Sequence, residues 1–290
     1  MSLTSTTQDK RERLAALLQG QRCVRAASLF DPMSARIADD IGFELGLMGG
    51  SVVSFAVLGD PDITLITLSE LAEQTRRVCR AGELAVLVDG DHGYGQAFNV
   101  ARTIAELEMA GASGVCIEDT VLPAPLHGDG AAALVSVEEG VAKMRAAVHA
   151  RGRSGLAVMA RTSAASLLGL DEAIVRLRAY AATGVDALFL PYLQSRAQLQ
   201  AIAAAVDLPL VLAAGDASLD DATFLAQHRV RVWHGGHQPF AAAVQASYEA
   251  MRALHAGVPA AQIPGLASKA LMARLTREAH FETLRRDWHR

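Results

Sequence analysis

Carboxylates gather at two places where a run of apolar residues ends. Asp89 and Asp91 follow the run LAVLV, and Glu118 and Asp119 follow the run GVCI. If these runs are neighbouring strands, the four carboxylates converge and repel one another unless a cation neutralises them. An oxygen-only ligand set selects Mg²⁺, or else Mn²⁺, over zinc, and Mg²⁺ keeps several waters beside one or two direct carboxylates. The alternative is that Asp91 and Asp119 are helix caps or loop residues.

Two further residues at the ends of apolar runs could bind an anionic substrate. Arg161 ends the run LAVMA, where an unpaired buried charge would be costly. It could clamp a substrate carboxylate with two hydrogen bonds, or it could form a structural ion pair with one of the acids. Ser51 follows Gly49 and Gly50, and its hydroxyl and amide could donate to a carboxylate. The alternative for Ser51 is an ordinary turn between strand and helix.

The string WHGGHQPF contains two histidines, His234 and His237. The glycine pair between them makes a turn, so the histidines do not share one helix face as in many zinc sites. One of them could orient a keto acid or handle a proton, while the other is a hydrogen-bonded structural residue.

The elements that position these residues alternate between short apolar runs and amphipathic stretches, which is typical of parallel β/α units. A closed (β/α)₈ barrel is the simplest architecture for 290 residues, and its catalytic groups lie at the C-terminal ends of the strands. A doubly wound open sheet is the alternative, but FDPMSAR after the first strand is not a glycine-rich phosphate loop. The predicted strands are Cys23–Ser28, Glu44–Gly50, Ala85–Asp89, Gly114–Glu118, Leu156–Arg161, Ala187–Leu190, Leu210–Leu212 and Arg231–His234. The predicted helices are Leu68–Ala81, Asn99–Ala110, Val137–Arg151, Leu170–Thr183, Arg196–Val206 and Phe240–Ala256.

The segment after Gly257 differs from the β/α pattern. VPAAQIPGLASK carries two prolines and precedes a last predicted helix, Ala270–Trp288. We therefore expect a single barrel domain over residues 1–290, with a helical extension at 258–290 that packs on a neighbouring subunit.

Composition excludes several classes of function. The formal net charge of −4 gives no basic footprint for nucleic acid or an anionic membrane, and 5% aromatic residues argue against base stacking. No run of about 18 apolar residues occurs, so no membrane span is expected. The three cysteines, Cys23, Cys79 and Cys116, are widely spaced, which argues against a disulfide framework and favours a reducing cytoplasm.

Four strings in order resemble the isocitrate lyase/phosphoenolpyruvate mutase superfamily over roughly residues 20–260: FDPMSARIADDIGFELGLMGGSVVS, VDGDHGYG, GASGVCIEDT and MART. The resemblance implies a (β/α)₈ barrel whose last helix is exchanged between subunits, usually in a tetramer. It also implies an Mg²⁺ ion that chelates an α-keto or α-hydroxy acid. By the same resemblance, Asp89 is the direct metal ligand and Asp91 and Glu118 act through water. Ser51 and Arg161 are then the residues that hold the substrate carboxylate.

The chain departs from several members of that superfamily in the loop after the fourth predicted strand. The lyases carry a cysteine there, in a KKCGH-like motif, as proton donor to the departing product. Here residues 122–140 read LPAPLHGDGAAALVSVEEG, without cysteine or lysine, which argues against isocitrate or methylisocitrate lyase activity. The phosphonate mutase uses lysine and asparagine in this loop, and both are missing. Ser163 stands where many relatives have Asp or Asn.

The remaining pattern resembles the oxaloacetate decarboxylase branch, in which a histidine at the position of His237 contacts the substrate. We therefore expect Mg²⁺-dependent decarboxylation of oxaloacetate to pyruvate and CO₂, with Asp89, Arg161 and His237 as the catalytic residues. The expected enzyme is a cytoplasmic homo-oligomer, a tetramer built as a dimer of dimers, that binds neither nucleic acid nor membrane. One alternative is a lyase or hydrolase that cleaves a C–C bond of a related diacid such as methylisocitrate. Another is a catalytically silent barrel that binds a keto acid.

Overall fold

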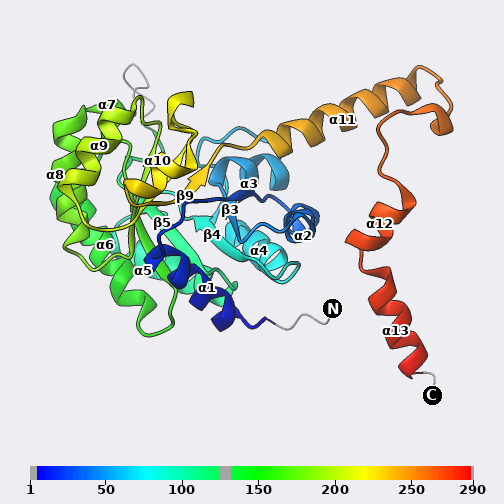
Figure 1. Ribbon diagram of the computed structural model, residues 1–290, viewed down its shortest axis with the longest axis horizontal. Coiled ribbons are helices and arrows are strands. Elements are labelled where there is room, and N and C mark those ends of the chain that lie inside the picture. Colours follow the sequence, from blue (N-terminus) through cyan, green and yellow to red (C-terminus); the bar gives the residue numbers. More distant parts are fainter. Residues whose placement is uncertain (1–4, 125–131, 289–290) are drawn as a thin grey trace. The chain divides into compact units, whose positions relative to one another are not determined.

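The computed structural model describes residues 5–124 and 132–288 and contains a barrel of parallel strands with helices between them (Figure 1). Around the barrel the strand segments follow in the order β1-β9-β8-β7-β6-β5-β4-β3-β2. The predicted (β/α)₈ barrel is confirmed, and the predicted strands and barrel helices end within two residues of the observed ones. The segments are β1 (Val24–Arg25), β2 (Ala27–Ser28), β3 (Leu45–Met48), β4 (Ala85–Asp89), β5 (Gly114–Glu118), β6 (Ala157–Arg161), β7 (Ala187–Pro191), β8 (Leu210–Ala213) and β9 (Val230–His234).

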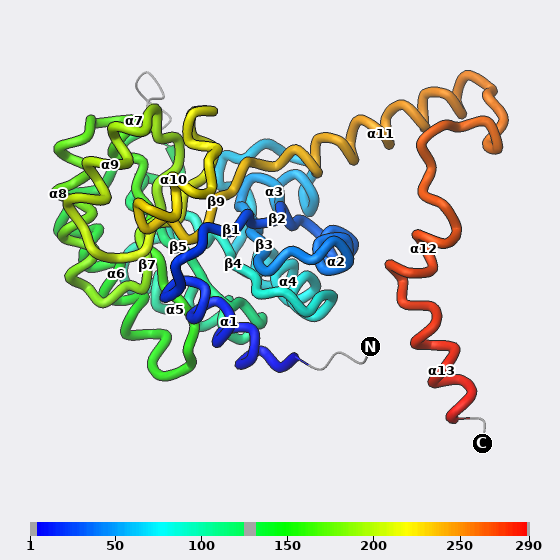
Figure 2. Tube along the Cα trace, in the orientation of Figure 1, coloured from blue at the N-terminus to red at the C-terminus, as the bar shows by residue number. Residues whose placement is uncertain are grey.

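The first strand is divided into two segments, and this division closes the barrel. β1 pairs with β9, whereas β2 pairs with β3 on the other side. Ala26, between the two segments, donates its N–H to the carbonyl of Trp233 at 3.0 Å. The single strand predicted over Cys23–Ser28 is therefore correct in place but serves two neighbours in turn. Figure 2 follows the chain from α1 through β1 and β2 into α2.

Helices follow most strands and cover the outside of the barrel. Several begin with a side-chain cap; for example, Thr67 and Glu70 form a reciprocal capping box at the start of α4. The barrel helices are α2 (Pro32–Ile41), α3 (Gly50–Val57), α4 (Leu68–Cys79), α5 (Ala97–Met109), α6 (Val137–Arg151), α7 (Ala164–Leu167), α8 (Leu170–Ala181), α9 (Arg196–Ala205) and α10 (Ala222–Gln227).

An additional helix, α1 (Thr7–Gln19), closes the N-terminal end of the barrel. Leu14 and Leu18 pack with the apolar residues of the barrel interior. Lys10 and Arg11 are also buried, and both donate to backbone carbonyls of the loops that lead into β4, β5 and β6. Hydrophobic periodicity does not predict this helix, because half of its buried residues are cationic. The acceptors are the carbonyls of Cys79, Gly82, Glu108, Ala112 and Ser154.

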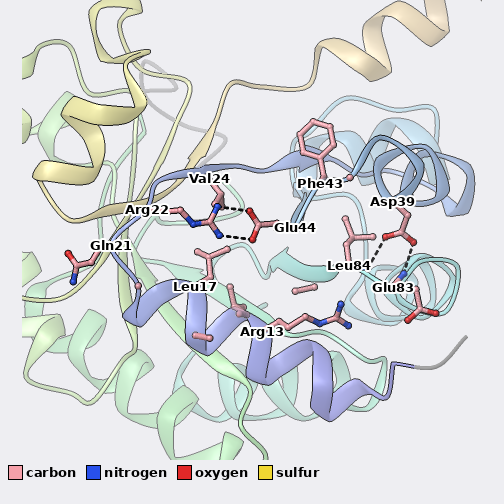
Figure 3. A pocket seen from close by; sticks show the side chains of 15 residues that line it. Arg13, Leu17, Gln21, Arg22, Val24, Asp39, Phe43, Glu44, Glu83 and Leu84 are labelled. Atoms are coloured by element: carbon pink, nitrogen blue, oxygen red, sulfur yellow. Dashed lines mark hydrogen bonds and ion pairs between the residues drawn. The ribbon is translucent and has the colours of Figure 1, made fainter.

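A hollow of about 490 Å³ lies beside α1, shown in Figure 3. Its charged groups are already paired: Arg22 holds Glu44 through two hydrogen bonds of 2.9 and 3.0 Å. The carboxylate of Asp39 accepts the backbone N–H groups of Glu83 and Leu84. Because this hollow lies at the N-terminal end of the barrel and its acids are used, it is not the site of chemistry.

Residues from His237 onward form a second compact unit, separate from residues 5–236. It contains α11 (Gln238–His255), in which no residue is buried, followed by α12 (Lys269–Leu275) and α13 (Glu278–Trp288). The single helix predicted over Ala270–Trp288 is wrong in one respect, because it is two helices. Arg277, between them, has a φ of 61°, which interrupts a right-handed helix. None of the described helices is both long and apolar enough to cross a bilayer.

Candidate active site

The predicted acids and arginine meet at the C-terminal ends of three neighbouring strands. Asp89 ends β4, Glu118 ends β5 and Arg161 ends β6. Each alternates with apolar residues that fill the barrel interior, such as Leu87, Cys116 and Met159, so all three side chains face inward. The register places Glu118 beside Arg161, and Asp89 beside Cys116.

Arg161 forms ion pairs with two of these acids. Its guanidinium contacts Asp89, and its Nε lies 3.1 Å from Glu118. It also lies over the ring of Phe189, at 5.6 Å from the centroid. Burial alone would lower the pKa of Arg161, but the charges of Asp89 and Glu118 outweigh burial and raise it well above its ordinary value. The ion pair that the sequence left as an alternative is thus present, and a clamp on substrate stays a prediction.

Asp91 completes the group from the loop after β4. Its φ is 48°, and its carboxylate accepts the hydroxyl of Tyr94 at 3.3 Å. A Cβ on Gly50, the first residue of α3, would lie 2.4 Å from Asp91 Oδ1. Burial, and then the charges of Asp89 and Glu118, raise the pKa of Asp91 well above its ordinary value. Asp91 therefore lies against the start of α3, next to Ser51, whose role in substrate binding stays a prediction.

Asp119, by contrast, belongs to a different cluster from the other three acids. It is fully buried, and its Oδ2 accepts Thr162 at 2.9 Å, Tyr180 at 2.7 Å and Arg176 at 3.0 Å. The expectation that four carboxylates converge is therefore wrong for Asp119. The alternative of a helix cap or a loop residue is wrong as well, because Asp119 is a buried, ion-paired carboxylate. Arg176 also donates to the carbonyl of Val135 at 2.8 Å, in the segment that follows Asp119. Residues 125–131 of that segment lie outside the described ranges. On either side of that gap, Val121 and Val135 donate to the carbonyls of Ala133 and Asp119, each at 2.8 Å.

Sequence reasoning missed Asp62, which lies in the loop after α3. Partial desolvation and then the charge of Asp89 raise the pKa of Asp62, whereas Arg161 lowers it. These influences place Asp62 within electrostatic reach of the carboxylate group. The apolar run before Asp62, FAVL, lies at the end of helix α3 and not in a strand, so a search of strand ends does not find Asp62. The one available signal is the acidic string Asp60-Pro61-Asp62.

The two histidines fall in different units of the chain. His234 ends β9, is buried, and has Nδ1 at 3.4 Å from the carbonyl of Ala26. His237 precedes α11 as its N-terminal cap residue and begins the second unit. Its contact with substrate therefore stays a prediction.

The carboxylate group fits a hard cation that is bound largely through water. Asp89, Asp91 and Glu118 face a single guanidinium, and burial raises the pKa of both Asp91 and Glu118. A divalent cation would relieve this repulsion, and oxygen donors suit Mg²⁺ or Mn²⁺. In the described residues, no three His, Cys, Asp or Glu side chains already form a direct ligand set.

Several known proteins are similar to this chain over nearly its whole length. The sequence profile described as phosphoenolpyruvate phosphomutase matches residues 14–255. A protein of Rhodopseudomonas palustris (strain BisB18) named oxaloacetate decarboxylase is 53% identical over 274 residues, covering 94% of this chain and 95% of the relative. One of the same name from Paraburkholderia xenovorans (strain LB400) is 49% identical and covers 94% and 91%.

Solved structures with the same fold are more distant in sequence. Phosphonopyruvate hydrolase in complex with oxalate and Mg²⁺ has a TM-score of 0.86 at 27% identity and covers 97% of this chain and 99% of that one. Oxaloacetate acetylhydrolase in complex with 3,3-difluorooxalacetate has a TM-score of 0.84 at 26% identity and covers 95% and 96%.

Proposed function

This chain belongs to the phosphoenolpyruvate phosphomutase family, and we propose that it decarboxylates oxaloacetate to pyruvate and CO₂ with the help of Mg²⁺ or Mn²⁺. The observation that carries the proposal is the 53% identity, over 94% of the chain, to a relative named oxaloacetate decarboxylase. The inward-facing Asp89, Glu118 and Arg161 supply the groups that such a reaction needs.

In the proposed site, Asp89 would be the direct ligand of the metal, and Asp91 and Glu118 would hold it through water. When bound, the metal supplies Lewis-acid stabilisation of negative charge on the C2 ketone oxygen of oxaloacetate. Arg161 and Ser51 hold the C1 carboxylate. The guanidinium has five N–H donors, so Arg161 can hold substrate while it remains near Asp89 and Glu118.

In the proposed reaction, the C3–C4 bond of the bound oxaloacetate breaks. The electron pair of that bond moves toward C2, the C2 ketone oxygen gains negative charge, and CO₂ leaves from C4. His237 is proposed to orient the substrate. A proton added at C3 converts the pyruvate enolate to pyruvate, which balances the reaction.

We further propose that the enzyme works in the cytoplasm as a homotetramer.

Oxaloacetate turnover in the presence and absence of Mg²⁺ tests the proposal, with pyruvate as the measured product. Free divalent metal decarboxylates oxaloacetate slowly, so the reference is the same metal without protein. We expect turnover well above this reference and a loss of at least about 100-fold in Asp89→Ala. The metal contributes several kcal/mol, and each ~1.4 kcal/mol corresponds to a factor of ten in rate. Asp171 is an exposed acid at the start of α8, so Asp171→Ala is the matched control and should retain activity.

Two other outcomes would contradict the proposal. Oxalate and acetate as products would indicate a hydrolase, an alternative favoured by the structural likeness to oxaloacetate acetylhydrolase. Thermal stabilisation by oxaloacetate without any product would indicate a silent keto-acid-binding barrel.

A further inference from the structure

Cys116 lies directly beneath the carboxylate group and has no role in the reaction described above. It occupies the middle of β5, is 0% exposed, and packs among the apolar residues of the barrel interior. The β4–β5 register pairs it with Asp89, and the alternation along both strands points the two side chains inward. Cys116 therefore contacts the apolar barrel interior on one side and Asp89 of the polar site on the other.

The thiol of Cys116 donates to Oδ1 of Asp89, with Sγ at 3.3 Å from the oxygen. The same oxygen accepts the backbone N–H of Asp91 at 3.3 Å, while Arg161 contacts the other oxygen, Oδ2. The backbone adds a further restraint, because Gly90 donates its N–H to the carbonyl of Cys116 at 2.9 Å. Both oxygens of the Asp89 carboxylate are thus fixed in direction.

We propose that Cys116 is a positioning residue, whose thiol orients the Asp89 carboxylate for metal binding. The inference rests on the proposed metal-dependent function. A thiol is a weak donor, so it directs the oxygen without neutralising the charge that the metal needs. Residues that hydrogen-bond to metal ligands in this way typically change metal affinity by about 10- to 100-fold when they are removed.

The ordinary explanation of a buried cysteine is that it fills space as a small apolar residue. Cys79 is the internal example of that case. It is buried at the end of α4, where its neighbours are Lys10 and Gly111 at the N-terminal end of the barrel. Cys79 therefore provides a matched control for loss of a buried sulfur without loss of a contact to Asp89.

The test measures Mn²⁺ binding without substrate, by the electron paramagnetic resonance signal of free Mn²⁺. We expect Cys116→Ala to raise the Kd for Mn²⁺ about tenfold. Cys116→Ser keeps a hydrogen-bond donor, so its Kd for Mn²⁺ should be much closer to that of the unsubstituted protein. The Kd of Cys79→Ala for Mn²⁺ should equal that of the unsubstituted protein. At saturating metal, the KM of Cys116→Ala for oxaloacetate should change less than its apparent affinity for metal.

Unchanged Mn²⁺ affinity in Cys116→Ala would overturn the proposal. So would equal weakening in Cys116→Ala and Cys116→Ser, because it would show that volume rather than the hydrogen bond matters. If Cys116→Ala does not fold, Cys116→Ser against Cys116→Val makes the same comparison between donor and non-donor. Mn²⁺ binding that depends on Cys116 in a protein that does not decarboxylate oxaloacetate would refute the proposed reaction and leave this inference standing.

Discussion

The loop after β4 holds Asp91 in a backbone conformation that few residues adopt without help. Asp91 and Tyr94 have φ values of 48° and 59°, in the left-handed region that Asp tolerates better than most residues. Such positions cost about 1–3 kcal/mol and persist where the surroundings determine them. Here the buried Lys143 of α6 donates to the carbonyl of His92 at 2.9 Å, and Tyr94 donates to Asp91. Contacts from the helix layer thus fix the loop that presents the carboxylate.

A substitution at Gly50 tests whether the close approach of Asp91 to α3 matters for activity. In Gly50→Ala, the new Cβ would lie 2.4 Å from Asp91 Oδ1, so the carboxylate must move. Gly50 is the first residue of α3 and lies outside the left-handed region, so alanine should not itself weaken the helix, and lost activity would be traced to Asp91. We expect kcat/KM for oxaloacetate to fall at least about tenfold, which corresponds to ~1.4 kcal/mol.

The control for this prediction is Gly235→Ala, where an added Cβ meets no atom within 4 Å. Equal kinetic losses in both variants would show that backbone freedom, rather than the contact with Asp91, explains the effect.

At the scale of the elements, alternation along β5 explains both what the sequence predicted and what it did not. Apolar runs that end in Asp89, Glu118 and Arg161 identified the strands and the site, because buried parallel strands are apolar on both faces. Asp119 was grouped with Glu118 by proximity in sequence, yet consecutive residues of an extended segment point to opposite faces. The partners of Asp119, Arg176 and Tyr180, come from α8, and no local pattern connects residues so far apart.

The Asp119 network makes a prediction about stability. Arg176 and Asp119 are both buried, so removing the carboxylate leaves a poorly compensated cation, which costs about 3–5 kcal/mol. Glu172, 2.9 Å from Arg176 Nε and partly exposed, offsets some of that loss. We therefore expect Asp119→Ala to lower the free energy of unfolding by about 3 kcal/mol in urea titrations. Tyr180→Phe removes one neutral donor and should cost only about 1–2 kcal/mol. A smaller loss in Asp119→Ala than in Tyr180→Phe would contradict this ranking.

At the scale of the whole molecule, the second unit carries an apolar face on α11. Val244, Tyr248 and Met251 of α11 are 52%, 65% and 70% exposed. Their spacing of four and three residues places them on one side of the helix. Large contiguous apolar patches on a protein surface commonly mark an interface. The expectation that residues 258–290 pack on another subunit, and that the protein is a tetramer, remains a prediction.

The oligomer prediction can be tested on the apolar face of α11. Light scattering after size exclusion should give the mass of a tetramer for the unsubstituted chain. Replacing Val244, Tyr248 and Met251 with glutamate should give smaller species, because each desolvated apolar side chain contributes about 1.5–3 kcal/mol to such an interface. Gln245→Lys is the matched control, since Gln245 lies on a neighbouring face and donates to Glu249 at 2.7 Å. A monomeric unsubstituted protein would contradict the prediction. If the substituted chain stays tetrameric while keeping its fold, the interface does not depend on this face of α11.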